Sequence, residues 1–248
     1  MANLMRTSNP ALNEKAFQGQ VAFGEAMTLQ GTVNKTGVLL LFVVVTAAWT
    51  WGLSHSNQPD AALPWMVGGV LGGFAVALVT IFKRNWSPIT APVYALLEGL
   101  ALGGISAVFE KMYPGVAIQA VGLTFGTLFM MLLAYKTGII KATQGFKIGV
   151  IAATGGIAVF YLVEMVLAVF FHVQVPAVNG SGFWGIAFSL FVVIIAALNL
   201  VLDFDMIATG VRGGAPKYME WYGAFGLMIT LIWLYLEILR LLAKARRR

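Results

Sequence analysis

The residues of this sequence with the clearest chemical potential are carboxylic acids inside apolar segments. The chain of 248 residues holds 10 Asp and Glu residues. Half of them lie within or at the edge of long apolar runs: Glu98, Glu164, Asp203, Asp205 and Glu237. An ionised carboxylate in hydrocarbon is costly, so each must face other helices, hold a proton or bind a cation. A converging group of such oxygens would titrate as a coupled set, and it suits a proton relay or a hard cation such as Ca²⁺.

Helical spacing separates the two aspartates. Successive helical residues turn by about 100°, so Asp203 and Asp205 point to roughly opposite sides of their helix. Asn199 lies one turn before Asp203 and shares its face. Asp205 lies closer to the end of the segment, where water reaches it more easily. We therefore expect Asp203 to be a site residue, with Asp205 and Asn199 as secondary candidates.

The glutamates allow more than one interpretation. Glu237 is either a gating group or the partner of Arg240, three residues further on the same helix. Glu98 follows Tyr94 by one turn in the middle of its run. It is either a gating acid or a protonated group bonded to a neighbouring helix. Glu164 has apolar neighbours only, which favours a structural role.

The composition of the chain indicates the class of protein in which these acids lie. Hydrophobic residues make up 59% of the chain, charged residues 10%, and the mean hydropathy is +0.84. A soluble domain carries about 25% charged residues, so this chain lacks the polar surface to be one. With no Cys and two His, thiolate metal sites, disulfide scaffolds and His-based zinc sites are excluded. No phosphate-binding loop or hydrolase motif is present, and we expect neither an enzyme nor a tightly bound cofactor nor nucleic-acid binding.

Seven apolar runs have the length needed to cross a hydrocarbon core, which takes about 20 helical residues. None alternates as a barrel strand does, so helices are predicted. The sequence therefore predicts an all-α integral membrane protein with seven transmembrane helices, whose main partner is the lipid bilayer. The predicted spans are Thr36–Leu53, Ala61–Phe82, Thr90–Phe109, Gly115–Tyr135, Ile148–Phe171, Phe183–Leu202 and Trp221–Leu239.

Three regions follow from these spans: a polar cytoplasmic tail over 1–34, a seven-helix domain over 35–243 and a basic tail over 244–248. The N-terminal tail and alternate connections hold ten Lys and Arg residues, against Lys111 alone in the other connections. This asymmetry predicts a cytoplasmic N-terminus. The five cations after Leu239 oppose it, unless the last segment is re-entrant. Short connections favour a bacterial inner membrane.

Glycines spaced by four residues predict close packing between helices. Such pairs favour contacts within one polytopic bundle over dimerisation. They are Gly69 with Gly73, Gly99 with Gly103 and Gly122 with Gly126.

Three motifs together resemble a known family. They are PVYALLEGLALGGISAVFE on the third span, LNLVLDFDMI on the sixth and WLYLEILRLL on the seventh. The chain resembles the Bax inhibitor-1 family (transmembrane Bax inhibitor motif proteins), and it looks most similar to the bacterial YccA-like branch. The resemblance implies a seven-helix fold whose last helix is central, surrounded by the other six. It also implies a pH-sensitive Ca²⁺ leak and, for eukaryotic members, a role in stress and cell death.

The resemblance assigns the family's functional acid pair to Asp203 and Glu237, and the third-helix acid to Glu98. The resemblance also implies that Asp203 and Glu237 bind Ca²⁺ transiently. Glu237 departs from the aspartate of the family by one methylene. An arginine that latches the pair is missing near Lys111, so Arg212 or Arg240 would have to replace it. Counted along the spans, the two acids differ in depth by roughly 15 Å, so they meet only if the seventh helix starts early or tilts.

Three functions remain open at this point. The first is a cation leak channel or exchanger, gated by protonation of Asp203 and Glu237. The second is a membrane interaction protein that regulates a membrane-bound protease or a stress pathway through its N-terminal tail. The third is a proton-coupled transporter of a small molecule, which the same acids would serve.

Overall fold

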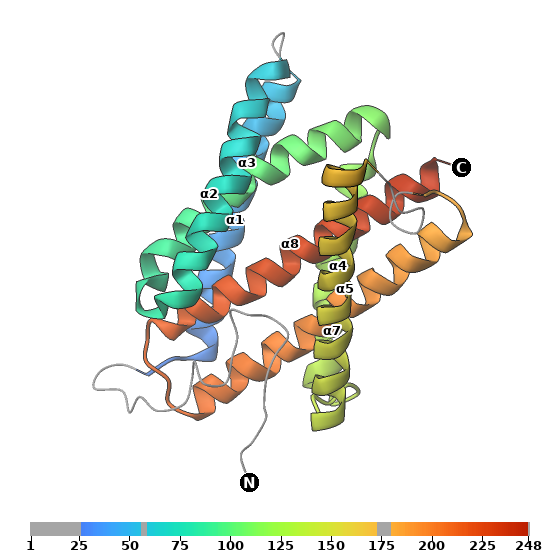
Figure 1. The fold of residues 1–248 in the computed structure, drawn as a ribbon. Coiled ribbons are helices and arrows are strands. Elements are labelled where there is room, and N and C mark those ends of the chain that lie inside the picture. Colours follow the sequence, from blue (N-terminus) through green and yellow to red (C-terminus); the bar gives the residue numbers. More distant parts are fainter. Residues whose placement is uncertain (1–25, 56–58, 173–179, 248) are drawn as a thin grey trace. The chain divides into compact units, whose positions relative to one another are not determined.

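The computed structural model describes residues 26–55, 59–172 and 180–247. Seven long helices, each long and apolar enough to cross a membrane, make up most of the described chain (Figure 1). Apart from one isolated antiparallel bridge, the described residues form no strand. This confirms the predicted all-α membrane protein with seven spans. The helices are α1 (Leu29–Ser54), α2 (Leu63–Phe82), α3 (Ser87–Met112), α4 (Val116–Lys136), α5 (Gln144–Phe171), α7 (Phe183–Arg212) and α8 (Met219–Arg246), with short 3₁₀ turns η2 (Pro59–Ala62) and η3 (Arg84–Trp86).

The chain divides into two compact units, and each is described by itself. Of the described residues, the α4–α5 unit comprises 115–172, 180–202 and 230–247. The α1–α3 unit comprises 26–55, 59–114 and 203–229 of the described chain. Helices α7 and α8 therefore contribute one part to each unit. Asp203 belongs to the α1–α3 unit and Glu237 to the α4–α5 unit, so the surroundings of these two acids are given separately.

Both ends of the helical region lie outside the predicted boundaries of 35 and 243. Helix α1 begins at Leu29, because the Thr28 hydroxyl accepts a hydrogen bond from the Gly31 amide at 2.9 Å and caps the helix. Helix α8 continues to Arg246 and includes Lys244, which was assigned to the basic tail. The predicted spans were defined by runs of apolar residues, and such runs leave out polar residues at helix ends. This is why α1 starts earlier and α8 ends later than predicted. Of the predicted N-terminal tail, residues 1–25 lie outside the described chain.

In the α1–α3 unit, α3 packs against both α1 and α2. Two glycine pairs make this possible. A Cβ on Gly69 would lie 2.5 Å from the Leu97 carbonyl oxygen of α3, and one on Gly103 would collide with Thr50 of α1. The prediction of packing within the chain is thus confirmed for the pairs on α2 and α3. Gly122 and Gly126 on α4 have no atom within 4 Å of such a Cβ, among the described neighbours.

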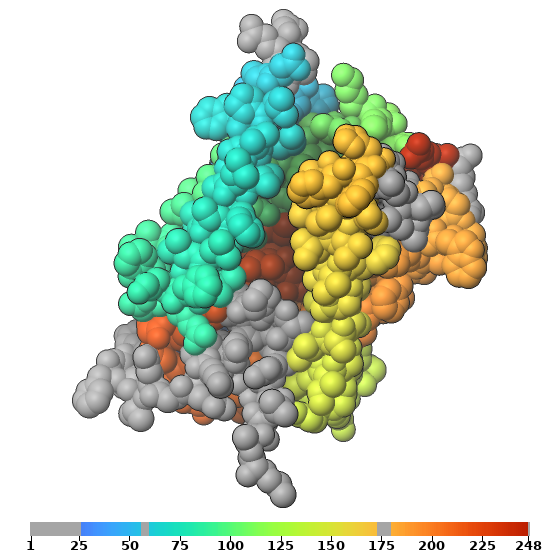
Figure 2. All heavy atoms as spheres, in the orientation of Figure 1, coloured from blue at the N-terminus to red at the C-terminus, as the bar shows by residue number. Residues whose placement is uncertain are grey.

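The α4–α5 unit is held by an apolar core. Its buried centre consists of Ile157, Val192 and Ile195, with Phe188 and Trp233 packed against it. Helix α5 is exposed along much of its length, as Figure 2 shows, and most of its exposed side chains are apolar. Helix α8 has the largest buried share of the seven spans. Its predicted position at the centre of a complete bundle involves both units and stays a prediction.

Candidate functional site

Glu237 lies at the centre of a compact polar cluster in the α4–α5 unit. Its side chain is 2% exposed. The Tyr161 hydroxyl of α5 lies 3.1 Å from each carboxylate oxygen, and Arg240 Nη1 donates to the same oxygens at 2.8 and 3.0 Å. Arg240 Nη1 also donates to the Tyr161 oxygen at 2.9 Å, and its guanidinium lies 5.3 Å from the ring centroid. The ion pair with Arg240 is confirmed, and a gating role for Glu237 stays a prediction.

This geometry makes Glu237 a carboxylate with its own internal cation. The pair is local, because Glu237 and Arg240 are neighbours on one face of α8. Tyr161 adds a hydroxyl from a different helix, which can donate to the carboxylate and accept from the guanidinium. A cation that binds Glu237 must therefore displace Arg240. Sequence reasoning missed Tyr161, since nothing local links it to residues on the last helix.

A second cation of α8 is also accommodated within this unit. Lys244 is buried and donates to Ser189 Oγ at 2.7 Å and to the Gly185 carbonyl at 3.2 Å. Arg246 donates to the Gln119 amide oxygen at 3.0 Å. The basic end of α8 is thus anchored to α7 and α4, and it does not form a separate tail.

Asn199, the secondary candidate, belongs to the α4–α5 unit. Its Nδ2 donates to Thr154 Oγ1 of α5 and to the Ile195 carbonyl, both at 2.8 Å. The bond to Thr154 joins α7 to α5, and the bond to Ile195 lies within α7. The amide therefore has a packing role in this structure, although it precedes Asp203 by one helical turn.

In the α1–α3 unit, Asp203 is fully buried at 0% exposure. Asp205 is partly exposed, in agreement with its expected position toward water. Glu98 is half-buried on α3, where its Oε2 lies 2.6 Å from the position of a Cβ on Gly73. Glycine at that position is what lets the carboxylate lie against α2. Tyr94, one turn earlier, packs edge-on against Phe225 of α8 with centroids 5.0 Å apart.

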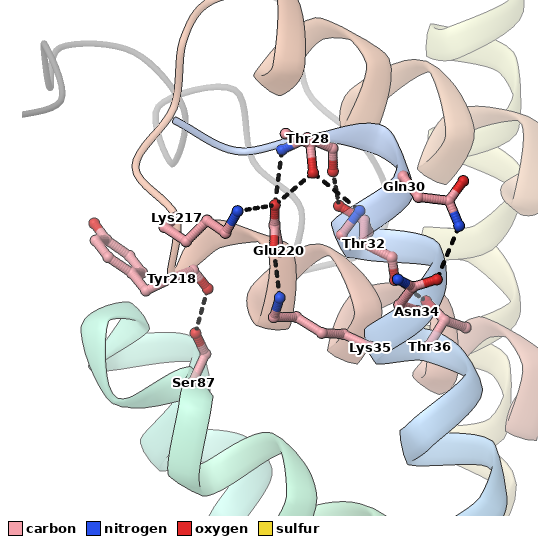
Figure 3. Close-up of polar contacts among 11 residues, drawn as sticks. Thr28, Gln30, Thr32, Asn34, Lys35, Thr36, Ser87, Lys217, Tyr218 and Glu220 are labelled. Atoms are coloured by element: carbon pink, nitrogen blue, oxygen red, sulfur yellow. Dashed lines mark hydrogen bonds and ion pairs between the residues drawn. The ribbon is translucent and has the colours of Figure 1, made fainter. Parts of the chain in front are cut away.

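Glu220 is a buried acid that the sequence reasoning missed. It lies one residue before the predicted start of the last span, yet its side chain is 0% exposed. The Thr28 amide and hydroxyl both donate to Oε1 at 2.8 Å, and Lys35 Nζ donates to Oε2 (Figure 3). Lys217 Nζ lies 3.4 Å from Oε1. We call Thr28, Lys35, Lys217 and Glu220 the Glu220 clamp.

Backbone contacts extend the Glu220 clamp. Ala26 and Pro216 form an antiparallel bridge, and the Met27 amide donates to the Ala215 carbonyl at 2.7 Å. The Ser87 hydroxyl at the start of α3 donates to the Tyr218 carbonyl at 3.0 Å (Figure 3). The segment before α1, the start of α3 and the α7–α8 connection are therefore tied together by polar contacts.

The predicted latch residues differ in their surroundings. Arg240 is bonded to Glu237, whereas Arg212 donates to Thr209 of its own helix at 3.1 Å. Within the described ranges, no group of three or more His, Cys, Asp or Glu residues could hold a metal ion. Contact between Asp203 and Glu237 stays a prediction, as does a transient Ca²⁺ role for either.

The comparisons with known proteins agree with the sequence motifs. No curated protein and no solved structure matches the chain significantly. The family described as Bax inhibitor 1 like matches residues 9–247, which is nearly the whole chain and includes every cluster described above. The protein with these buried acids and seven apolar helices therefore belongs to the Bax inhibitor 1 like family.

Proposed function

We propose that the protein is a cation leak pathway for Ca²⁺ that is gated by protons. The observation that carries this proposal is the burial of two carboxyl groups, Asp203 and Glu237, on helices suited to cross a membrane. Buried acids in membrane spans occur mainly where ions or protons are bound or passed on. Glu98, half-buried on α3, is the third group of the proposed pathway.

The Glu237 cluster supplies a mechanism for the gate. While Glu237 is ionised, it is neutralised by Arg240, and a passing cation must compete with the guanidinium. A proton on the carboxylate removes the charge that holds Arg240, whose side chain is 38% exposed and can turn toward water. Tyr161 then keeps one hydrogen bond to the neutral acid. Proton binding and release of the latch are thereby coupled at one carboxylate.

Asp203 has a different part in this proposal. It is fully buried, so it exchanges a proton or a cation only when water reaches it. The substitution Asp203→Asn keeps the size of the side chain and removes the group that can bind or release a proton. The matched control is Asp205, which is two residues away and partly exposed.

The placement in the cell is part of the proposal. The charge asymmetry of the connections supports a cytoplasmic N-terminus. The short connections support a bacterial inner membrane, and the motifs on the third, sixth and seventh helices support the YccA-like branch.

The test is Ca²⁺ entry into dye-loaded liposomes, measured from about pH 5 to about pH 8. Wild type is compared with Asp203→Asn, Glu237→Gln and the control Asp205→Asn. We expect a pH-dependent flux that loses its pH dependence in the first two variants and keeps it in the control. A flux no greater than that of empty liposomes, from folded protein, would refute the leak pathway.

The Glu220 clamp favours a second candidate, an interaction protein that regulates a membrane-bound protease or a stress pathway. The bridge between Ala26 and Pro216 ties the first described residue of the chain to the α7–α8 connection. Deletion of residues 1–25 would then abolish regulation of the partner and leave ion flux intact. If the deletion instead abolishes flux alone, the interaction role is excluded.

A further inference from the structure

The α7 segment that carries Asp203 lies beside the start of α8, and the start of α1 lies beside the same turn of α8, inside the α1–α3 unit. A Cβ on Gly223 of α8 would lie 3.3 Å from Ile207 of α7, 3.4 Å from Thr32 of α1 and 3.5 Å from Met27. Asp203 precedes Ile207 by one helical turn and shares its face. The start of α8 therefore lies against α7 one turn from the buried acid, and the start of α1 lies against that part of α8.

The Glu220 clamp fixes the starts of both α1 and α8. Glu220 belongs to α8, and its carboxylate binds Thr28 and Lys35 at the start of α1. It fits there because residue 31 is glycine: a side chain on Gly31 would collide with the Glu220 carboxylate. The Lys35 ammonium also lies 5.5 Å from the Trp221 ring centroid. While these contacts hold, the first turns of α1 and α8 cannot separate.

The chemistry of the clamp makes it able to open. Its ties are hydrogen bonds and ion pairs, whose partners can be exchanged for water, unlike the apolar contacts beneath them. Water already reaches the two lysines, since the Lys35 side chain is 20% exposed and that of Lys217 is 45% exposed. Asp203, in contrast, is sealed at 0% exposure. A proton or cation can reach it only if some neighbouring contact gives way.

We propose that the Glu220 clamp is a regulatory lock, whose release admits water and ions to Asp203 from the side of the α7–α8 connection. The lock rests on the proposed function only for its physiological role, because access to α7 can be measured without any flux. Closed, the clamp holds α1 against the part of α8 that lies beside Ile207. Open, it allows α8 to move from α1 and hydrates this face of α7.

The first experiment measures access directly. The chain has no Cys, so Ile207→Cys introduces a single thiol beside Gly223. A membrane-impermeant thiol reagent is applied to the protein in liposomes, with and without Lys35→Met. Asn34→Ala is the matched control, because Asn34 is exposed and its side chain accepts a hydrogen bond from Gln30, outside the clamp. We expect labelling to be severalfold faster with Lys35→Met and unchanged with the control.

The second experiment closes the lock covalently. Residues of an antiparallel bridge lie about 4.5–5.5 Å apart at Cα, within the range for a disulfide. Ala26→Cys with Pro216→Cys, in an otherwise Cys-free chain, is compared oxidised and reduced. We expect the oxidised form to lose Ca²⁺ flux and the reduced form to regain it. This variant keeps Glu220 and Lys35, so it does not depend on the fold tolerating their loss.

The outcomes separate the two proposals. If Lys35→Met leaves labelling of Ile207→Cys at the wild-type rate, the lock is refuted, whatever the flux does. If wild type carries flux and the oxidised protein carries the same flux, the lock is likewise refuted while the leak pathway stands. If labelling depends on the clamp but wild type carries no flux, the lock is supported and the leak pathway fails.

Discussion

Helix α8 carries two buried glutamates that are paired in different ways. Glu237 is held by Arg240 on the same helix, with Tyr161 as the only contribution from another helix among the contacts described. Glu220 is held by Thr28 and Lys35, which lie in a segment distant in sequence. A local pair can be broken without separating helices, whereas the Glu220 clamp joins the first and last spans. The first arrangement suits ion chemistry and the second suits control of structure.

The largest effect on stability is expected from Glu220→Gln. The substitution leaves Lys35 without its ion pair and weakens the two hydrogen bonds from Thr28, whose acceptor is no longer charged. Breaking a buried ion pair costs about 3–5 kcal/mol, and we expect a loss of about 3 kcal/mol in the free energy of unfolding. Thermal unfolding in detergent measures it, with Asn34→Ala expected to change stability by less than about 0.5 kcal/mol. Equal stability of the two variants would show that the clamp does not hold the helices.

Arg240→Gln should destabilise less and affect flux more. The guanidinium is 38% exposed, so water already screens the pair and the expected cost is about 1–2 kcal/mol. Glu237 then lacks its internal cation, and a passing cation meets no competitor. Flux measurements in liposomes should show a leak that is higher than wild type at the same pH. If Arg240→Gln unfolds the protein as readily as Glu220→Gln, the contrast between local and long-range pairing is wrong.

The same contrast explains what the sequence could predict. The seven spans were recovered because the thickness of the hydrocarbon core imposes apolar runs of a set length. The Glu237–Arg240 pair was visible because its members are three residues apart on a helix. Tyr161 and Lys35 were not visible as partners, because their contacts join segments that helical periodicity does not relate. The burial of Glu220 was not predicted either. Glu220 follows the polar α7–α8 connection, and the residues that bury it lie in a distant segment.

Helix ends were the other limit of prediction. The residues that begin α1 and end α8 are polar and are stabilised by specific contacts, such as the Thr28 cap and the bonds of Lys244. Those contacts place both groups in the folded helices even though their composition is that of a tail. The contacts that sequence analysis did not predict are therefore made by polar residues at the edges of the apolar runs.

Tyr161→Phe tests how far the Glu237 cluster extends beyond its own helix. The ring and its packing remain, and only the hydroxyl is removed. A hydrogen bond to a charged group contributes about 1.5–3 kcal/mol. Arg240 still binds the carboxylate, so we expect the free energy of unfolding to fall by about 1.5 kcal/mol. A double-mutant cycle with Glu237→Gln measures the coupling by thermal unfolding. Additive effects would mean that the hydroxyl contributes only to packing of α5.

The smallest effect on stability is expected from Lys217→Met. This variant shows whether the exposed lysine matters less to the clamp than Lys35 does. Lys217 lies 3.4 Å from Glu220 Oε1, but its side chain is 45% exposed. Pairs of this kind contribute about 0–1 kcal/mol, so stability should change by less than about 0.5 kcal/mol. Labelling of Ile207→Cys should then rise only slightly, against a severalfold rise for Lys35→Met. If the two lysine variants open the clamp equally, the lock depends on the net charge around Glu220 and not on the buried pair with Lys35.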